Sequence, residues 1–233
     1  MTQKRNLALF DLDHTLLPLD SDYQWADFLA RTGRAGDPDE ARRRNDDLMD
    51  RYNAGNLTAE QAAEFMLGLL AGKDRNELAR WHDEFMRDII LPSVLPQARA
   101  LVDQHLQAGD LCAIVTATNS FVTAPIAKEF GIGHLIATDP ELRNDRYTGR
   151  IAGIPSFKAG KVTRVEQWLA PMGLDMAAFA QSWFYSDSTN DLPLLERVSH
   201  PVATNPSPTL DQIARERSWT ILRLFDELQD PKS

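Results

Sequence analysis

Cysteine is nearly absent from this chain, and long apolar runs are missing. Cys112 is the single cysteine among 233 residues and lies inside a short apolar run. No disulfide framework can therefore form, and a buried thiol is expected. No stretch stays apolar over the length of a membrane span, and residues 1–6 are polar, unlike a signal peptide. These absences predict a soluble cytoplasmic protein without a membrane span.

Basic residues are also in the minority. The chain has 34 Asp and Glu against 25 Lys and Arg, a formal net charge of -9. This balance argues against nucleic acid or anionic lipid as the main partner. The one basic cluster, residues 42–44, lies among acidic residues and is typical of a solvated helix face with ion pairs. Nothing in the sequence indicates the oligomeric state.

Two aspartates directly follow a short apolar run near the amino terminus. Residues 7–10 fit a strand buried on both faces, although so short a run is also compatible with a buried helix. Asp11 and Asp13 come next, and in an extended segment residues i and i+2 project to the same side. Such a carboxylate pair indicates a catalytic or metal-binding site. Two close negative charges are stable only if the pKa of one carboxyl is raised or if a metal ion or another cation neutralises them. In the alternative interpretation, Asp11 opens a turn and Asp13 caps a helix.

Helical periodicity replaces strand patterning between residues 18 and 91. Asp20 or Ser21 can cap a first helix, and polar or amphipathic helices are expected over about 39–53, 58–71 and 75–90. The apolar run at 65–71 fits the core of a small helical bundle better than a membrane or partner surface.

Strand and helix alternate from residue 92 to the end. Buried strands are expected at 111–115, ending at Thr116, at 135–138, at 183–185 and at 202–204, with a hairpin through 144–145 and a helix after most strands. The pattern predicts an α/β fold with a three-layer α/β/α, Rossmann-like core built on a parallel sheet. We assign residues 1–17 and 92–233 to this core and 18–91 to an inserted α-helical cap.

Polar side chains follow three of the expected strands. Asp11 and Asp13 follow the first, Thr116 the second, and Asp187 and Asp191 the third. Because the carboxyl ends of parallel strands meet at one edge, the four carboxylates should lie together there. Such a cluster requires a cation, and an all-oxygen donor set selects a hard ion such as Mg²⁺. A site of this kind is suited to a phosphoryl group.

Each of these residues also has a purely structural interpretation. Thr116 can finish a strand and bond locally, and Asp191, which precedes a proline in the first helical turn, can be an N-cap. Lys158 and Lys161, at the start of a helix, can supply a second cation or be ordinary surface lysines. His14 is expected beside the site without ligating. The order and joint spacing of the residues carry the functional interpretation.

In these motifs the chain resembles the haloacid-dehalogenase-like phosphatase superfamily. The matching motifs are DLDHT at 11–15, IVT at 114–116, the helix-start lysine and SDSTND at 186–191. It looks most like the phosphoserine-phosphatase branch, of histidinol-phosphatase and phosphoserine-phosphatase type, in which a helical cap lies between the first two motifs. Similar members keep a lysine directly before a valine, which favours Lys161 over Lys158. Ser186 in place of Gly, and Thr116 in place of Ser, are mild departures.

The resemblance implies roles for the site residues. Asp11 would attack phosphorus and become an aspartyl phosphate, while Asp13 would act as general acid and then as general base. Asp11, the backbone carbonyl of Asp13 and Asp187 would hold Mg²⁺. Two further residues, Asn190 and Asp191, would support the metal site. Thr116 and Lys161 would grip the phosphoryl oxygens.

The expected function is a Mg²⁺-dependent phosphatase of a small phosphomonoester. Histidinol phosphate, phosphoserine and a lipid head-group phosphate are the candidate substrates. A phosphotransferase of the same family and a non-catalytic phosphate-binding module are the alternatives. We further expect Asp20, Asp22 and Lys158 to contact substrate. For Asp20 the resemblance supplies the reason, because in similar phosphoserine phosphatases an acidic residue at the matching position contacts the substrate amine. The alternative is that Asp20 and Ser21 only cap the first cap helix.

Overall fold

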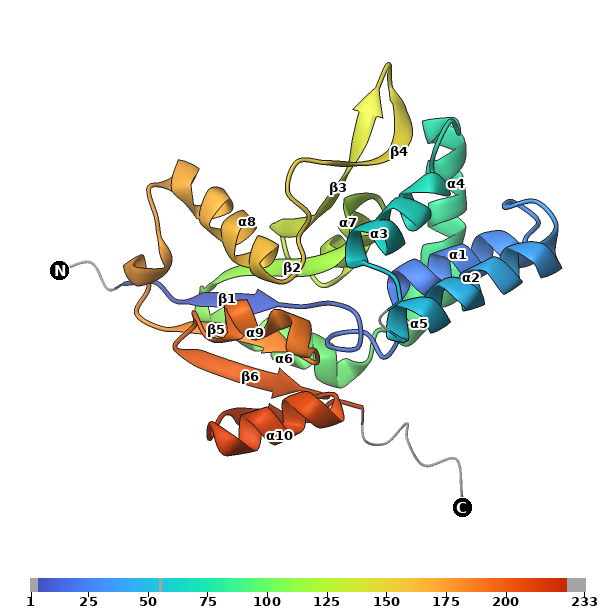
Figure 1. Cartoon of the computed structure of the whole chain (residues 1–233). Helices are drawn as coiled ribbons and strands as arrows, with labels where there is room; N and C mark the ends of the chain where they lie inside the picture. Colours follow the sequence, from blue (N-terminus) through green and yellow to red (C-terminus); the bar gives the residue numbers. More distant parts are fainter. Residues whose placement is uncertain (1–3, 55, 226–233) are drawn as a thin grey trace.

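A computed structural model describes residues 4–54 and 56–225, and a sheet forms its centre (Figure 1). Within these residues the sheet has seven strands in the order β4-β3-β2-β1-β5-β6-β7. The strands are β1 (Leu7–Phe10), β2 (Leu111–Asn119), β3 (Leu135–Arg143), β4 (Arg146–Ala152), β5 (Ser182–Ser186), β6 (His200–Thr204) and β7 (Thr220–Leu222). All neighbours are parallel except β3 and β4.

Helices cover both faces of this sheet. The α-helices are α1 (Ser21–Arg31), α2 (Pro38–Asn53), α3 (Ala59–Gly68), α4 (Arg75–Phe85), α5 (Leu91–Ser93), α6 (Pro96–Ala108), α7 (Ser120–Glu129), α8 (Ala159–Leu169), α9 (Leu192–Leu195) and α10 (Pro208–Glu216). A π-helix, η1 (Met86–Ile90), and three 3₁₀ turns, η2 (Ala170–Met172), η3 (Met176–Ala178) and η4 (Thr189–Asp191), complete the described elements. Within the described part of the chain, no helix is long and apolar enough to cross a membrane.

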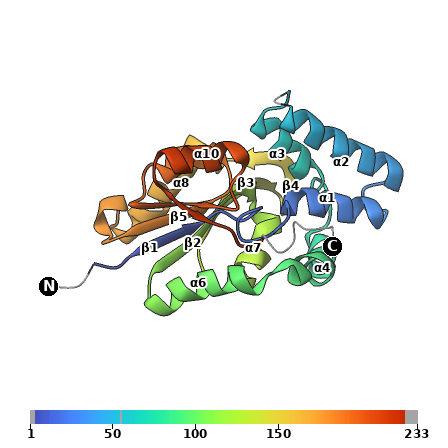
Figure 2. The ribbon, with the colours of Figure 1, turned by 90° about the horizontal axis from the view of Figure 1, so that it is seen from below.

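The side chains of the buried strand β1 pack into two hydrophobic cores, one on each face of the sheet. Ala8 and Phe10 pack on one face with residues of α6 and α7, while Leu7 and Leu9 pack on the other face with residues of α8, α9 and α10. This alternation follows from the two-residue period of a strand. Figure 2 shows α6 below the sheet and α8 and α10 above it. The predicted three-layer α/β class is confirmed.

Helices α1–α4 form a group beside the sheet (Figure 1). Trp25 and Phe28 of α1 join Phe85 of α4 in the same core cluster as the sheet residue Phe10. The expected helix over 75–90 is regular only to Phe85 and continues as the π-helix η1. Pro92 offers no N–H to a carbonyl one turn earlier, which interrupts the regular hydrogen-bond pattern at this point.

The β3–β4 hairpin is present as predicted. Asn144 and Asp145 form its two-residue turn, both with positive φ (48° and 61°), as a type I′ turn requires. The hairpin reaches the helical group, where Gly72 N donates to Tyr147 O over 3.1 Å. Gly149 (φ +87°) faces the same segment, and a Cβ there would lie 3.3 Å from Ala71 Cβ. The helical group therefore contacts the core through the hairpin as well as through its two connections.

Candidate active site

The site lies at the carboxyl ends of β2, β1 and β5. Phe10 is in register with Ile114 of β2 and with Tyr185 of β5. Asp11 therefore lies at the same level of the sheet edge as the residues that follow these two partners. The expected end of β2 at Thr116 is wrong, because β2 runs on to Asn119 with a register shift after Val115.

Lys161 joins two of the carboxylates. Its Nζ lies 2.9 Å from Asp11 Oδ1 and 2.7 Å from Asp191 Oδ2, and its side chain is 3% exposed. Asp191 precedes α9 but makes no side-chain cap there. Its carboxylate instead accepts hydrogen bonds from Lys161 and from the Ser186 hydroxyl at 2.7 Å.

The loop before α8 determines which lysine enters the site. A Cβ at Gly160 would lie 2.2 Å from Pro155 O, so the chain can turn this tightly only with glycine at that position. Lys161 then falls on the buried side of α8. Lys158 is exposed, with its ammonium 5.2 Å from the Phe157 ring centroid, and it does not join the carboxylates.

Thr15 connects the ends of β1 and β5. Its Oγ1 lies 3.3 Å from Asp11 Oδ2 and 3.4 Å from Asp187 Oδ1, and it accepts the backbone N–H of Asp187 at 3.1 Å. Thr15 was not among the expected site residues, although it closes the DLDHT motif that contains them. Both carboxylates thus lie within reach of one hydroxyl.

Negative charge exceeds positive charge in this cluster. Partial burial, together with Asp11 and Asp191, raises the pKa of Asp187 to about 8. Burial also raises the pKa of Asp191 to about 6 and that of Asp11 above its ordinary value, against the opposing effect of Lys161. Burial alone would lower the pKa of Lys161, but its two carboxylate partners raise it. The cluster can therefore accept a further cation.

The carboxylates of Asp11 and Asp187 suit Mg²⁺ better than Zn²⁺. Within the described residues, no group of three or more His, Cys, Asp or Glu side chains is arranged as a metal site. Asp11 and Asp187 nevertheless offer two oxygen-donor carboxylates on either side of Thr15. Mg²⁺ typically uses one or two carboxylates and completes its shell with water and substrate phosphate, whereas structural Zn²⁺ needs four protein ligands. The pair therefore fits Mg²⁺.

Asp13 turns away from this pair. Its Oδ2 accepts the Thr118 hydroxyl at 2.6 Å, and its Oδ1 accepts the backbone N–H of Ser21 at 2.9 Å. Burial, with a smaller contribution from Asp20, raises its pKa to about 6. The side chain of Asp13 is therefore not placed as a metal ligand beside Asp11, which leaves only its backbone carbonyl for that role.

The other expected residues have local partners. Thr116 is buried, and its hydroxyl accepts the backbone N–H of Thr118 at 3.2 Å. Asn190 donates its backbone N–H to the Ser188 hydroxyl. His14 is exposed.

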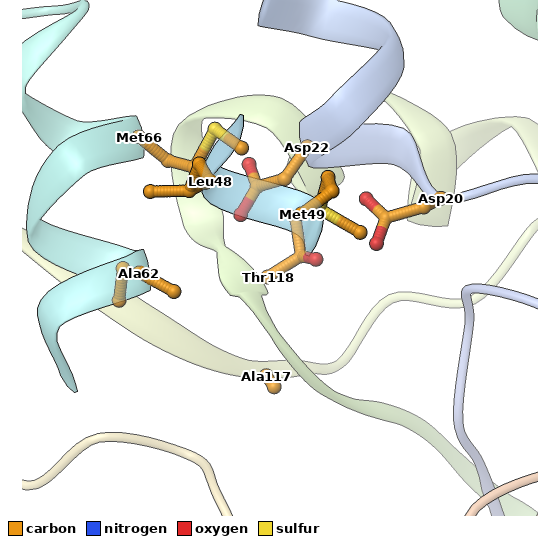
Figure 3. Close-up of a pocket in the computed structure, with 9 residues that line it drawn as sticks. Asp20, Asp22, Leu48, Met49, Ala62, Met66, Ala117 and Thr118 are labelled. Atoms are coloured by element: carbon orange, nitrogen blue, oxygen red, sulfur yellow. The ribbon is translucent and has the colours of Figure 1, made fainter. Parts of the chain in front are cut away.

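A pocket lies between β2 and the helical group (Figure 3). It is adjacent to Asp13 through Thr118, which lines the pocket and donates to the Asp13 carboxylate. Its volume is about 110 Å³. It is lined by Asp20, Asp22, Leu48, Met49, Ala62, Ala63, Met66, Ala117 and Thr118. The lining is apolar apart from two carboxylates and one hydroxyl.

The two pocket carboxylates are held differently. Asp20 is the N-cap of α1 and accepts the backbone N–H of Tyr23 at 2.8 Å. Asp22 accepts the side-chain amide of Asn119 at 2.8 Å, and burial, with the charges of Asp20 and Asp13, raises its pKa well above the ordinary value. Asn119, which sequence reasoning missed, also caps α7. Neither carboxylate has a cationic partner in the described contacts.

Comparisons with known proteins identify the family of this chain. The family model for haloacid dehalogenase-like hydrolases matches residues 8–196. A histidinol-phosphatase of Neisseria meningitidis serogroup C (strain 8013) is 42% identical over 219 residues, which cover 94% of this chain and 98% of that protein.

Solved structures show the same fold. A protein of unknown function from Bordetella pertussis Tohama I has a TM-score of 0.93 and 72% identity, covering 94% of this chain and 99% of that one. A substrate-bound phosphoserine phosphatase has a TM-score of 0.66 at 15% identity, covering 95% and 94% of the two chains. The chain therefore belongs to the haloacid dehalogenase-like hydrolase family.

Proposed function

We propose that this chain is a Mg²⁺-dependent phosphatase that hydrolyses a small, amino-bearing phosphomonoester through an aspartyl phosphate on Asp11. The observation that carries the proposal is the buried ammonium of Lys161, which lies within hydrogen-bond distance of both Asp11 and Asp191. A fixed cation beside a carboxylate nucleophile neutralises the charge of an incoming phosphoryl group. The histidinol-phosphatase relative supports the reaction class.

In the first step Asp11 attacks phosphorus, and the bond to the leaving alcohol breaks. Lys161 holds the phosphoryl oxygens together with the Thr116 hydroxyl, and it keeps the Asp11 carboxylate in place. Asp13 gives a proton to the leaving oxygen. In the second step Asp13 takes a proton from water, which attacks the aspartyl phosphate and restores Asp11.

Asp11, the backbone carbonyl of Asp13 and Asp187 would hold Mg²⁺, with Asp191 and Asn190 in supporting positions. The ion would offset the charge of the carboxylates and of the phosphoryl group. Support for this assignment comes from the raised pKa of Asp187, since a carboxylate destabilised by burial and by its neighbours gains from a nearby cation.

The pocket beside Asp13 would hold the non-phosphate part of the substrate. Asp20 and Asp22 suit an ammonium or an imidazolium, because both are carboxylates without a cationic partner in a largely apolar wall. A cavity of about 150 Å³ accepts benzene, so a pocket of about 110 Å³ suits a five-membered ring or a short alkylammonium.

We extend the proposal to the helical segment 18–91, which would act as the cap over this site. The pocket lies between helices of this segment and β2, so a substrate enclosed there would be separated from bulk water. We place the enzyme in the cytoplasm, which is consistent with its single, buried cysteine.

A phosphate-release screen tests the proposal. The panel is histidinol phosphate, phosphoserine, glycerol phosphate and nitrophenyl phosphate, each measured with Mg²⁺ and with a chelator. We expect Mg²⁺-dependent release, highest with the amino-bearing compounds, and none from Asp11→Asn. Equal release from Asp11→Asn, or a purified wild-type protein inactive on every compound, would reject the function and favour a phosphate-binding module.

A further inference from the structure

The carboxylate of Asp13 is held from two sides. The Thr118 hydroxyl, on the core strand β2, lies 2.6 Å from Oδ2. The backbone N–H of Ser21, the first residue of α1, lies 2.9 Å from Oδ1. Each oxygen therefore has its own donor, and together the two fix the rotation of the carboxyl group about its Cβ–Cγ bond.

The two donors differ in chemistry. A backbone N–H can only donate, whereas a hydroxyl can donate to a carboxylate or accept from a carboxylic acid. Oδ2 is thus the oxygen whose partner can either donate to it or accept from it. A group that gives a proton in one step and takes one in the next needs a partner that accommodates both forms.

Thr118 joins Asp13 to the pocket that we propose for the non-phosphate part of the substrate. It lines the pocket that also contains Asp20 and Asp22, as Figure 3 shows. The residue is 7% exposed. Its backbone N–H donates to the Thr116 hydroxyl at 3.2 Å, which holds the backbone at Thr118 beside the candidate active site.

We propose that Thr118 is a positioning residue for the proton-transfer step, whose hydroxyl orients Asp13 so that Oδ2 faces the leaving oxygen. This inference rests on the proposed phosphatase function, in which Asp13 is the proton donor. The Ser21 N–H acts from the opposite side and ties the orientation of Asp13 to the start of the helical segment.

The test compares Thr118→Val, which removes the hydroxyl but keeps the shape, with Thr118→Ser, which keeps the hydroxyl. The substrates are histidinol phosphate, whose alkoxide must be protonated on leaving, and nitrophenyl phosphate, whose phenolate need not be. The quantity measured is kcat/KM, which covers only the steps through release of the leaving group. The rate of the later hydrolysis of the aspartyl phosphate therefore does not affect this quantity.

We expect Thr118→Val to lower kcat/KM on histidinol phosphate about 10- to 100-fold, the cost of a misplaced catalytic group. The loss on nitrophenyl phosphate should be several times smaller, and Thr118→Ser should stay close to wild type on both. Equal losses on the two substrates, or a serine variant as impaired as the valine variant, would overturn the proposal.

Two controls separate positioning from folding. Thr204→Val removes another buried threonine hydroxyl, one that donates to the Val202 carbonyl, and it should leave the ratio between the two substrates unchanged. If Thr118→Val does not fold, Thr118→Ala is compared with Thr118→Ser instead. Both variants lack the γ-methyl group of threonine, and only the serine variant keeps the hydroxyl. An inactive wild type would reject the phosphatase function itself, whereas active variants with an unchanged ratio would reject only the role of Thr118.

Discussion

Lys161 Nζ lies 2.9 Å from Asp11 Oδ1, and the lysine side chain is almost completely buried. A buried ammonium is costly unless it is paired, so its position depends on the carboxylates around it. This contact joins the start of α8 to the end of β1 across 150 residues of sequence. It also separates the two candidate lysines, because Lys158 is exposed.

The first prediction concerns these two lysines. Lys161→Ala should raise KM and lower kcat, with kcat/KM reduced about 100-fold or more, the scale for loss of one group that stabilises the developing charge. Lys158→Ala should stay close to wild type, because its ammonium lies over Phe157 and away from the cluster. Steady-state kinetics on nitrophenyl phosphate decide the matter, and a larger loss in Lys158→Ala would show that the wrong lysine has been assigned.

Asparagine substitutions of the two aspartates in the first motif should reduce activity in different ways. Asp11→Asn loses the nucleophile and should be inactive on every substrate. Asp13→Asn keeps the nucleophile and loses proton transfer, a contribution of about 10²- to 10⁴-fold. Its kcat/KM should therefore be less reduced with nitrophenyl phosphate than with an alkyl phosphate. An equal reduction with good and poor leaving groups would count against Asp13 as the general acid.

Turnover should require Mg²⁺. We expect no phosphate release in a chelator, recovery with Mg²⁺, and inhibition by Ca²⁺, whose larger and looser coordination shell disturbs the in-line geometry. Asp187→Asn should raise the Mg²⁺ concentration needed for half-maximal activity. Full activity in the chelator would remove the metal from the mechanism.

Mg²⁺ binding should also depend on pH. The pKa of Asp187 is raised to about 8, so in metal-free protein its carboxyl is mostly protonated near pH 6 and mostly ionised near pH 9. Because the pKa of Asp187 is higher in the folded protein than in the unfolded chain, this carboxyl contributes its full stability only at a pH below its unfolded-state pKa. The contribution is lost as the pH rises through about 8. Mg²⁺ binds the ionised form and restores stability, so the increase in Tm on adding Mg²⁺ should be greater near pH 9 than near pH 6.

The increase in Tm is the difference between samples with and without Mg²⁺ at the same pH. The effect of titrating groups outside the site on Tm is therefore removed. Burial lowers the pKa of His82, so His82 changes the stability with the opposite sign near pH 6, but equally with and without Mg²⁺. Asp187→Asn should remove most of the pH dependence of the increment and leave the smaller part that comes from Asp11 and Asp191, whose pKa values are also raised. Equal increments at the two pH values in the wild type would contradict the raised pKa as the cause.

The fold was predictable because its signals are local. Short apolar runs that mark buried strands, helices of regular apolar spacing and their alternation all lie within short windows of sequence. The hairpin turn at Asn144 and Asp145 is of the same kind, since its residue types match the positive φ angles found there. The π-helix η1 and the extension of β2 to Asn119 were not predicted, because the first depends on an interrupted ladder and the second on pairing with β3.

The site was only partly predictable, because its contacts join distant segments. Asp11 and Asp187 could be found from the sequence, since each lies just beyond the end of an expected strand. The partners of Asp13 and Asp22 could not, since Thr118 lies 105 residues from Asp13 and Asn119 lies 97 residues from Asp22. No local pattern marks such a hydroxyl or amide as the partner of a carboxylate.

The last prediction concerns the charge of the pocket. Asp20 both caps α1 and lines the pocket, so one substitution must remove the charge without removing the cap. Asparagine does this, because Asn and Asp are about equally good N-caps, whereas Ala costs about 0.5–2 kcal/mol of stability. Asp20→Asn should therefore keep its Tm, and Asp20→Ala should lower it. Asp22→Asn likewise keeps an oxygen that can accept the amide of Asn119.

If the carboxylates bind a substrate cation, each asparagine variant should lose roughly 1 to 3 kcal/mol of transition-state stabilisation on histidinol phosphate, measured from kcat/KM, the scale of a charge-assisted hydrogen bond. Nitrophenyl phosphate has no cation, and its phosphate is repelled by nearby carboxylates, so its kcat/KM should be unchanged or slightly higher. Opposite responses of the two substrates cannot come from loss of folding, which would lower both. A parallel fall on both substrates in Asp20→Asn and Asp22→Asn, with Tm unchanged, would mean that the pocket does not recognise an amine.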